Sequence, residues 1–222
     1  MIPRLAPGDA LANEYLAFLS ALPKAGFTGE IHLDHASRLA CATDNSVYQI
    51  LPQGVLQPRC RADVVCVMSL LAEPQFREVS LTARGGGTGT NGQSLTDGLV
   101  LDLSRYMNKI LNIDLDAGYA CIQPGVVLDQ LNDELRPHGV FFAPNLSPSN
   151  RATIGGMIAT DAAGKGSRIY GKTSEHILEL ETILLDGTAI RSHSLGTDEL
   201  ARLSQRDNRA ASIHRELRTI CA

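Results

Sequence analysis

The stretch Arg84-Gly85-Gly86-Gly87-Thr88-Gly89-Thr90-Asn91-Gly92 decides the fold of this chain. Five of these nine residues are glycine, and apolar, extended patterns flank the stretch at 79–83 and 98–103. Glycine lets main-chain N–H groups approach a ligand closely because it has no Cβ, and successive N–H groups turned to one side form an anion-binding nest. Arg84 adds a positive charge within reach of phosphate oxygens. This glycine loop (residues 84–92) therefore predicts a cradle for the diphosphate of a nucleotide cofactor.

Three other interpretations of the glycine loop remain open. Gly87-x-Gly89-x-x-Gly92 matches the dinucleotide fingerprint, but that motif requires a helix directly afterwards, whereas residues 95–98 predict a turn before a strand. The same segment approaches a Walker A loop, except that Gln93 stands where that loop requires lysine. A ligand-free surface loop is the third, although a tight turn needs one or two glycines rather than five. The diphosphate cradle is favoured over all three.

A second small-residue stretch supports this choice, and it reads Thr153-Ile154-Gly155-Gly156-Met157-Ile158-Ala159-Thr160-Asp161-Ala162-Ala163-Gly164. It is followed by Tyr170-Gly171 and by a strand pattern that ends in Asp186-Gly187. Together with the glycine loop, these motifs resemble the FAD-binding domain of the vanillyl-alcohol-oxidase/p-cresol-methylhydroxylase (PCMH) superfamily. The resemblance runs from about Asp44 to the end of the chain. One departure is residues 161–164, where many members of the superfamily read N-A-G-G.

Residues 26–30, 42–49 and 164–173 are similar to the N-terminal part of the large bacterial FAD/iron–sulfur D-2-hydroxyacid dehydrogenases. That resemblance implies oxidation of a D-2-hydroxyacid, such as D-2-hydroxyglutarate or D-lactate, to the 2-oxoacid, with hydride transfer to flavin N5. A different FAD-dependent oxidase or reductase of the superfamily, and a non-catalytic nucleotide-binding module, stay as alternatives. In the resembled enzymes the substrate-binding residues lie mainly in a cap and in later segments, so the catalytic residues of this protein are unknown.

The resemblance also implies an α+β fold, in which two α+β lobes of a PCMH-type domain hold the cofactor between them. We expect an N-terminal helical and extended segment over 1–45, a first lobe over 46–109 and a second lobe over 110–222. Apolar periodicity and turn residues predict helices over 9–22, 61–71, 197–203 and 208–220, one more helix carrying Val127, Leu128, Leu131 and Leu135, and strands over 79–83, 99–103, 111–115, 119–123 and 177–185. Thr197 is the expected N-cap of its helix.

The expected cofactor is FAD, and the resemblance divides its contacts among three regions. The glycine loop would cradle the diphosphate, residues 153–160 and Gly164 would pack against ribityl and isoalloxazine, and Ile183 would contact the cofactor through its backbone. The expected set is Arg84, Gly85, Gly86, Gly87, Thr88, Gly89, Thr90, Asn91, Pro144, Thr153, Gly155, Gly156, Ile158, Ala159, Thr160, Gly164, Tyr170, Gly171 and Ile183. We expect non-covalent binding, because Thr88 stands where flavin-tethering members of the superfamily place a histidine.

Bulk properties exclude several other classes of function. The net charge of −4 is spread without the basic stripe that nucleic-acid binding needs. No apolar run approaches the ~20 residues of a membrane span, and no signal peptide is evident, so a cytoplasmic location is expected. The five cysteines contain no C-x-x-C pair, which argues against a disulfide framework or an iron–sulfur site in this chain. His32 and His35 could share a helix turn, but no metal site is expected.

Further expectations concern partners and the extent of the chain. The substrate would be a small 2-hydroxyacid, while the sequence leaves the electron acceptor unspecified. Because the resembled enzymes are much longer, we expect this chain to be a fragment that does not turn over substrate alone. A cap domain and any iron–sulfur cluster would lie in a C-terminal part. Apolar surface exposed in such a fragment would favour a homodimer.

Overall fold

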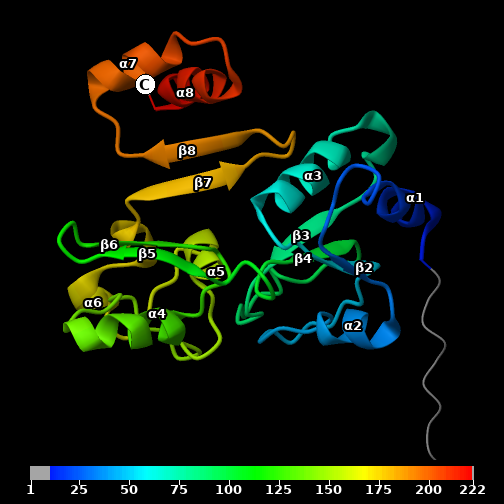
Figure 1. The fold of residues 1–222 in the computed structure, drawn as a ribbon, viewed down its shortest axis with the longest axis horizontal. Helices are drawn as coiled ribbons and strands as arrows, with labels where there is room; N and C mark the ends of the chain where they lie inside the picture. Colours follow the sequence, from blue (N-terminus) through cyan, green and yellow to red (C-terminus); the bar gives the residue numbers. More distant parts are fainter. Residues whose placement is uncertain (1–10, 222) are drawn as a thin grey trace, which may run out of the picture.

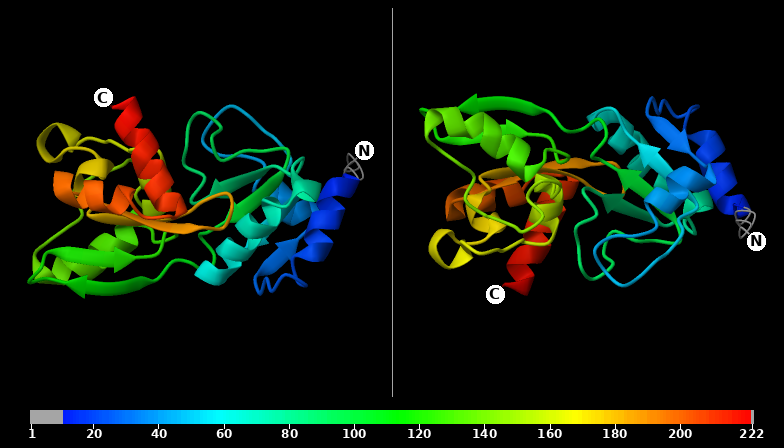
Figure 2. Two further views of the ribbon diagram at one scale, coloured as in Figure 1. Left: turned by 90° about the horizontal axis from the view of Figure 1, so that it is seen from above. Right: turned by 90° about the horizontal axis from the view of Figure 1, so that it is seen from below.

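The computed structural model describes residues 11–221, and two hydrophobic cores organise this part of the chain. Figures 1 and 2 show the elements of the two cores lying side by side, with the N-terminal half of the chain at one end and the middle of the chain at the other. The first core contains α1 (Asn13–Ala21), β1 (Glu30–His32), α2 (His35–Ala40), β2 (Gly54–Gln57), α3 (Arg61–Leu71), the short 3-10 helix η1 (Pro74–Phe76), β3 (Leu81–Arg84) and β4 (Leu99–Asp102).

A four-stranded sheet in the order β1-β2-β4-β3 underlies the first core. β1 is antiparallel to β2, whereas β2 and β3 both run parallel to the central β4. Leu99, Val100 and Leu101 of β4 are at most 3% exposed, as expected for a parallel strand covered on both faces. Because β3 is an edge strand and the glycine loop follows its carboxyl end, the loop emerges where open parallel sheets commonly bind ligands.

Helices α1 and α3 supply most of the apolar side chains that cover this sheet. Phe18 of α1 is fully buried, and its ring meets Phe76 edge-to-face at 5.2 Å between centroids. Aromatic pairs in this geometry add to the stabilisation that burial provides. The predicted helix over 9–22 is confirmed for 13–21, while positions 9 and 10 lie outside the described residues.

The second core is built around a hairpin and two helices. The hairpin strands β5 (Ile110–Asp114) and β6 (Tyr119–Ile122) pair in antiparallel fashion around the predicted turn. Leu128, Leu131 and Leu135 point inward from one face of α4 (Leu128–Leu135), where they meet buried residues of α5 (Ile154–Ala159). Short helical turns complete this region, namely η2 (Arg136–His138), α6 (Ser167–Tyr170) and η3 (Thr173–His176).

A second hairpin, β7 (Glu179–Ile183) and β8 (Ala189–His193), reaches from the second half of the chain to helix α3 of the first core. Arg61 and Glu181 form an ion pair at 2.8 Å across this contact, and Gly187 packs against Ser69. Beyond the hairpin, α7 (Thr197–Ser204) and α8 (Arg209–Ile220) lie together at the top of Figure 1. In residues 11–221, no helix has the length and apolar character needed to cross a bilayer.

The α+β prediction is confirmed, but the structure corrects two local expectations and contains a helix that was not predicted. His32 lies in β1 and His35 begins α2, so the two histidines share no helix turn. The reason is that β1 pairs with β2, and the Asp34 carboxylate caps α2 by accepting from the Ser37 N–H. The N-cap of α7 is Gly196, and Thr197 is its first helical residue. Helix α5 was not predicted, because its glycines and alanine give no clear apolar period.

Candidate cofactor site

The glycine loop presents a run of main-chain N–H groups that have no protein partner. Within residues 11–221, the N–H groups of residues 85–90 donate no hydrogen bond, whereas the Asn91 N–H donates to Gln93 Oε1 at 3.0 Å. Gly87 and Gly92 have φ angles of +59° and +75°, a conformation that L-residues rarely adopt. An unpaired N–H group is costly unless water or a ligand satisfies it. The loop therefore has the donors that a diphosphate needs.

The Arg84 side chain is used within the protein. Its guanidinium donates to the Thr43 carbonyl at 2.7 Å, to the Ser94 hydroxyl at 3.2 Å and to the Cys41 carbonyl at 3.4 Å. These bonds tie the start of the glycine loop to the segment between α2 and β2. The guanidinium therefore helps to shape the loop, and its contact with phosphate oxygens, which the sequence predicted, stays a prediction.

An ionised carboxylate, Asp44, extends the hydrogen-bond network around Arg84. The Ser94 hydroxyl, which accepts from Arg84, donates to Asp44 Oδ2 at 3.3 Å. Partial burial raises the pKa of the Asp44 carboxyl. Hydrogen bonds from Ser46 and Ser94 and the charge of Arg84 lower this pKa, and together they outweigh the effect of burial. The net pKa lies below the ordinary value of 3.8. Asp44 is therefore charged at neutral pH and balances Arg84.

Two glycines of the loop are required by a close approach between the two cores. A Cβ added at Gly85 would overlap the hydroxyl of Thr153, and one at Gly86 would overlap the carbonyl oxygen of Arg151. The glycine loop and the beginning of α5, which the sequence predicted to act together, are thus in direct contact. At these two positions glycine is needed for protein packing, whether or not a ligand is present.

The N-terminus of α5 offers little to an anion because its donors are already used. The Ile154 and Gly155 N–H groups each donate at 2.8 Å, to Val126 O and Pro124 O respectively, and the Gly156 N–H is capped by the Thr153 hydroxyl at 3.4 Å. Thr153 is 2% exposed and acts as the N-cap of α5. An anion at this junction would therefore rely on the glycine loop, unlike the pyrophosphate of a dinucleotide fold, which rests on a helix N-terminus.

The outer face of α5 is open and carries only small side chains. Gly156, Ala159 and Thr160 are exposed, whereas Ile154 and Met157 on the opposite face are buried in the second core. The spacing of three to four residues places the small residues on one side of the helix. This face is accessible to a flat ring system, and the expected packing of residues 153–160 and Gly164 against ribityl and isoalloxazine stays a prediction.

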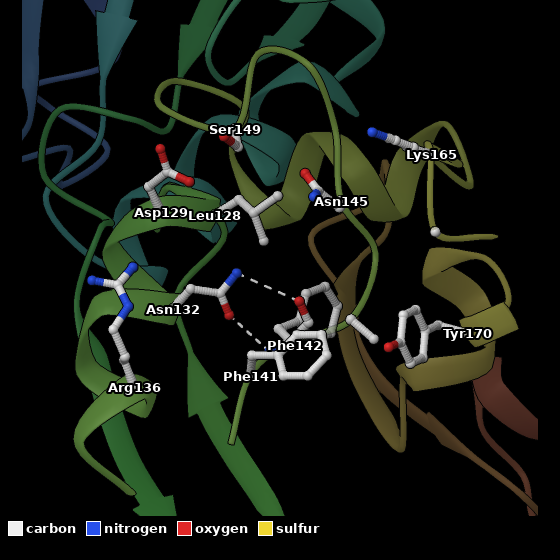
Figure 3. A pocket seen from close by; sticks show the side chains of 12 residues that line it. Leu128, Asp129, Asn132, Arg136, Phe141, Phe142, Asn145, Ser149, Lys165 and Tyr170 are labelled. Carbon is white, nitrogen blue, oxygen red and sulfur yellow. Dashed lines mark hydrogen bonds between the residues drawn. The ribbon is translucent and has the colours of Figure 1, made fainter. Parts of the chain in front are cut away.

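Residues 141–171 bring several further candidates together, and Figure 3 shows the cavity beside them. A Cβ at Gly164 would overlap the carbonyl oxygen of Asn145, which places Gly164 directly beside the segment that contains the buried Pro144. Asn132 holds that segment through the Phe142 backbone, with bonds of 2.7 and 3.5 Å. The cavity has a volume of about 610 Å³. Tyr170 is the one expected cofactor residue with its side chain on the wall, and no residue of the glycine loop lines it.

Ile183 stands apart from the other expected residues. It is the last residue of β7, it pairs with Ala189, and its hairpin packs against α3. Within the described part of the chain, no hydrogen bond joins Ile183 to the glycine loop or to α5. Residues 11–221 contain no cluster of three or more potential metal-ligating side chains.

Comparison with known proteins identifies the architecture around this loop. A family model described as "FAD binding domain" matches residues 52–193, which include the glycine loop and the beginning of α5. The chain belongs to this family. The expectation of an FAD-binding domain is thereby confirmed, and FAD is the cofactor of the family.

Curated relatives extend the comparison to nearly the whole chain. D-2-hydroxyglutarate dehydrogenase of Pseudomonas putida is 56% identical over 201 residues, which are 90% of this chain and 20% of that protein. D-2-hydroxyglutarate dehydrogenase of Pantoea ananatis is 46% identical over 221 residues, which are 100% of this chain and 22% of that protein. The chain thus spans about a fifth of the length of these relatives.

Solved structures agree on the fold. An alkyldihydroxyacetonephosphate synthase structure matches with a TM-score of 0.71 at 23% identity, covering 84% of this chain and 39% of that one. A xylooligosaccharide oxidase from Myceliophthora thermophila matches with a TM-score of 0.67 at 19% identity, covering 80% of this chain and 37% of that one. At these identities the likeness extends to the fold alone.

Two further residues lie at the site without any signal in the sequence, Asn45 and Arg151. Asn45 bonds to the carbonyl groups of Thr88 and Gly89, and Arg151 donates to the Asn45 side chain. The polar run at 43–46 has an irregular pattern, and nothing local to it shows that it folds onto a loop more than forty residues away.

Proposed function

We propose that this chain is the FAD-binding part of a dehydrogenase that oxidises a D-2-hydroxyacid to the 2-oxoacid. The observation that carries the proposal is the 46–56% identity to two D-2-hydroxyglutarate dehydrogenases over at least nine tenths of this chain. Relatives named for glycolate and for D-lactate, which are also 2-hydroxyacids, are 31% and 34% identical. D-2-hydroxyglutarate is therefore the proposed substrate, and the electron acceptor stays unassigned.

The proposed FAD site begins at the glycine loop. Its unpartnered N–H groups at 85–90 would donate to the diphosphate, whose charge such main-chain nests stabilise. Arg84 would act indirectly, since its bonds to Thr43 and Ser94 fix where the loop begins. When bound, FAD supplies the two-electron acceptor for the oxidation.

The flavin ring and ribityl chain would lie along the open face of α5, which Gly156, Ala159 and Thr160 form. Thr153 would position this face by capping the helix. We propose that residues 1–45 form an N-terminal segment, and that FAD lies between a first lobe over 46–109 and a second lobe over 110–222. Contact with the cofactor stays a prediction for the other expected residues, which are Pro144, Gly155, Ile158, Gly164, Tyr170, Gly171 and Ile183.

We further propose a cytoplasmic location and a homodimer. The five free thiols suit a reducing compartment, where disulfides are rare. Sedimentation velocity at two protein concentrations tests the dimer, which should give way to the monomer on dilution.

The substrate assignment is tested with the full gene product that carries this sequence, loaded with FAD. We expect D-2-hydroxyglutarate to bleach the visible flavin absorption and to sustain turnover with a dye acceptor, whereas the L enantiomer does neither. D-lactate and glycolate define the tolerance for the side chain. A flavin that all these hydroxyacids leave oxidised, but that another class of substrate reduces, would contradict the proposed reaction and leave the FAD site standing.

A further inference from the structure

Asn45 links three parts of the proposed FAD site. Its backbone N–H donates to the Gly89 carbonyl at 3.1 Å, and its Nδ2 makes a longer contact of 3.5 Å to the Thr88 carbonyl. Its Oδ1 accepts from the Arg151 guanidinium at 3.2 Å. Asn45 belongs to the segment between α2 and β2, the glycine loop to the first core, and Arg151 to the approach to α5. One side chain therefore bridges the two sides of the cofactor site.

These contacts fix the direction of two peptide groups. In a planar trans peptide, the carbonyl of one residue and the N–H of the next point in opposite directions, and residues 11–221 contain no cis peptide bond. Because the Thr88 and Gly89 carbonyls point at Asn45, the N–H groups of Gly89 and Thr90 point away from it. Both N–H groups lack a partner in the described chain. Asn45 therefore favours the loop conformation that presents two adjacent donors.

The loop needs such a restraint because glycine permits the opposite arrangement. Gly87 and Gly89 flank Thr88, and glycine adopts φ angles of either sign at little cost. Rotation of the peptide between Thr88 and Gly89 would turn a carbonyl oxygen toward a bound diphosphate. Two negative groups would then face each other, and anion binding would be lost.

Arg151 determines how the Asn45 amide is oriented. A guanidinium is a donor only, so the atom that faces Arg151 must be Oδ1, which leaves Nδ2 for the Thr88 carbonyl. Arg151 is itself held in place, because its carbonyl oxygen lies against Gly86. The contact between the two cores thus sets the orientation of the loop through Asn45.

We propose that Asn45 is a positioning residue for the FAD diphosphate and that Arg151 is its anchor. The proposal rests on the FAD site described above. The Asn45 side chain acts through the Thr88 carbonyl, while its backbone N–H holds the Gly89 carbonyl, and neither group bonds to the cofactor itself. The Asn45 side chain should therefore affect ligands that carry a diphosphate and leave other ligands unaffected.

The test compares Asn45→Ala, Arg151→Ala and the double variant with wild type, using apoprotein and added FAD. Each single substitution should raise the Kd for FAD about three- to tenfold, the range for one or two exposed hydrogen bonds. The double variant should resemble the singles, since both residues act through one contact chain. Asn112→Ala is the matched control, because Asn112 is an exposed asparagine of β5 that belongs to no part of the site.

A ligand comparison separates positioning from a loss of fold. ADP, which contains the diphosphate, should bind more weakly to Asn45→Ala, whereas the affinity for riboflavin and the Tm of the apoprotein should match wild type. Unchanged FAD and ADP affinities in Asn45→Ala would overturn the proposal and leave the proposed function intact. Equal weakening of riboflavin and ADP would also overturn it, as a merely structural effect. Failure of wild type and Asn112→Ala to bind FAD would refute the FAD site itself, and this proposal with it.

Discussion

Gly86 lies so close to Arg151 that a Cβ at Gly86 would overlap the Arg151 carbonyl oxygen. The obstacle is backbone, so a larger residue forces the two cores apart instead of moving a flexible side chain. Gly86→Ala should lower the free energy of unfolding of the apoprotein by about 1–3 kcal/mol, the usual cost of overpacking. Chemical denaturation without FAD measures this change. Gly86→Ala with the same free energy of unfolding as wild type would refute the close contact.

Gly89 provides the clean test of the cradle that Gly86 does not. A Cβ there would meet the Gln93 side chain, with Cδ at 2.5 Å, and that side chain can move aside. Gly89→Val should therefore leave the apoprotein folded but weaken FAD binding by at least about tenfold, because branched carbons would crowd the donors that face the diphosphate. Fluorescence titration gives the Kd, and Gln93→Ala controls for the displaced side chain. Wild-type affinity in Gly89→Val would count against the loop as the cradle.

FAD should be released intact when the protein is denatured. The position after the three glycines is Thr88, whose hydroxyl cannot form the histidyl link expected of tethering relatives. Acid precipitation of the FAD-loaded protein should leave all the yellow colour in the supernatant. A fluorescent pellet that survives washing would demonstrate a covalent bond.

Asp63 should make the stability of the first core depend on acid pH. The side chain is 1% exposed and accepts from the Thr28 and Arg59 backbone N–H groups, both at 2.7 Å. Burial raises the pKa of this carboxyl, and these hydrogen bonds lower it. The hydrogen bonds have the larger effect together, so the pKa lies below its ordinary value of 3.8. A lowered folded-state pKa means that the ionised form stabilises the fold above the unfolded pKa, and that this contribution is lost as pH falls through the folded pKa.

Asp63→Asn should therefore reduce the free energy of unfolding at neutral pH by about 1.5–3 kcal/mol, the range for hydrogen bonds to a charged group. Urea denaturation over a pH series measures the difference, which should shrink as pH falls below 3.8. Asp116→Asn, in the exposed turn between β5 and β6, should change little. A difference between Asp63→Asn and wild type that is independent of pH would mean that ionisation of Asp63 does not stabilise the fold.

The sequence predicted those features of the site that depend on local pattern. Glycine density identified the loop, and the resemblance to the FAD-binding domain of the superfamily implied that the segment beginning at Thr153 acts together with it. Apolar periodicity predicted α3 and α4, because their buried leucines and valines recur at helical spacing. Helix α5 was missed since Gly155 and Gly156 carry no such signal, although Thr153 is a good N-cap.

The other features of the site depend on contacts between residues that are far apart in the sequence. Arg84 reaches Thr43 across 41 positions, and Arg151 reaches Asn45 across 106. No local propensity encodes such pairs, so the sequence predicted neither the hydrogen bonds that Arg84 makes within the protein nor a role for Asn45. The same limit applies to Gly86, whose neighbour Arg151 is visible only in the folded chain.

The most direct test of the central claim is amide NMR of the ¹⁵N-labelled 222-residue chain during titration with FAD. We expect the N–H resonances of residues 85–90 to shift most, with smaller changes at Gly156, Ala159 and Thr160 on the outer face of α5. Shifts confined to the cavity beside Asn132 and Tyr170, with the glycine-loop amides unchanged, would contradict the claim.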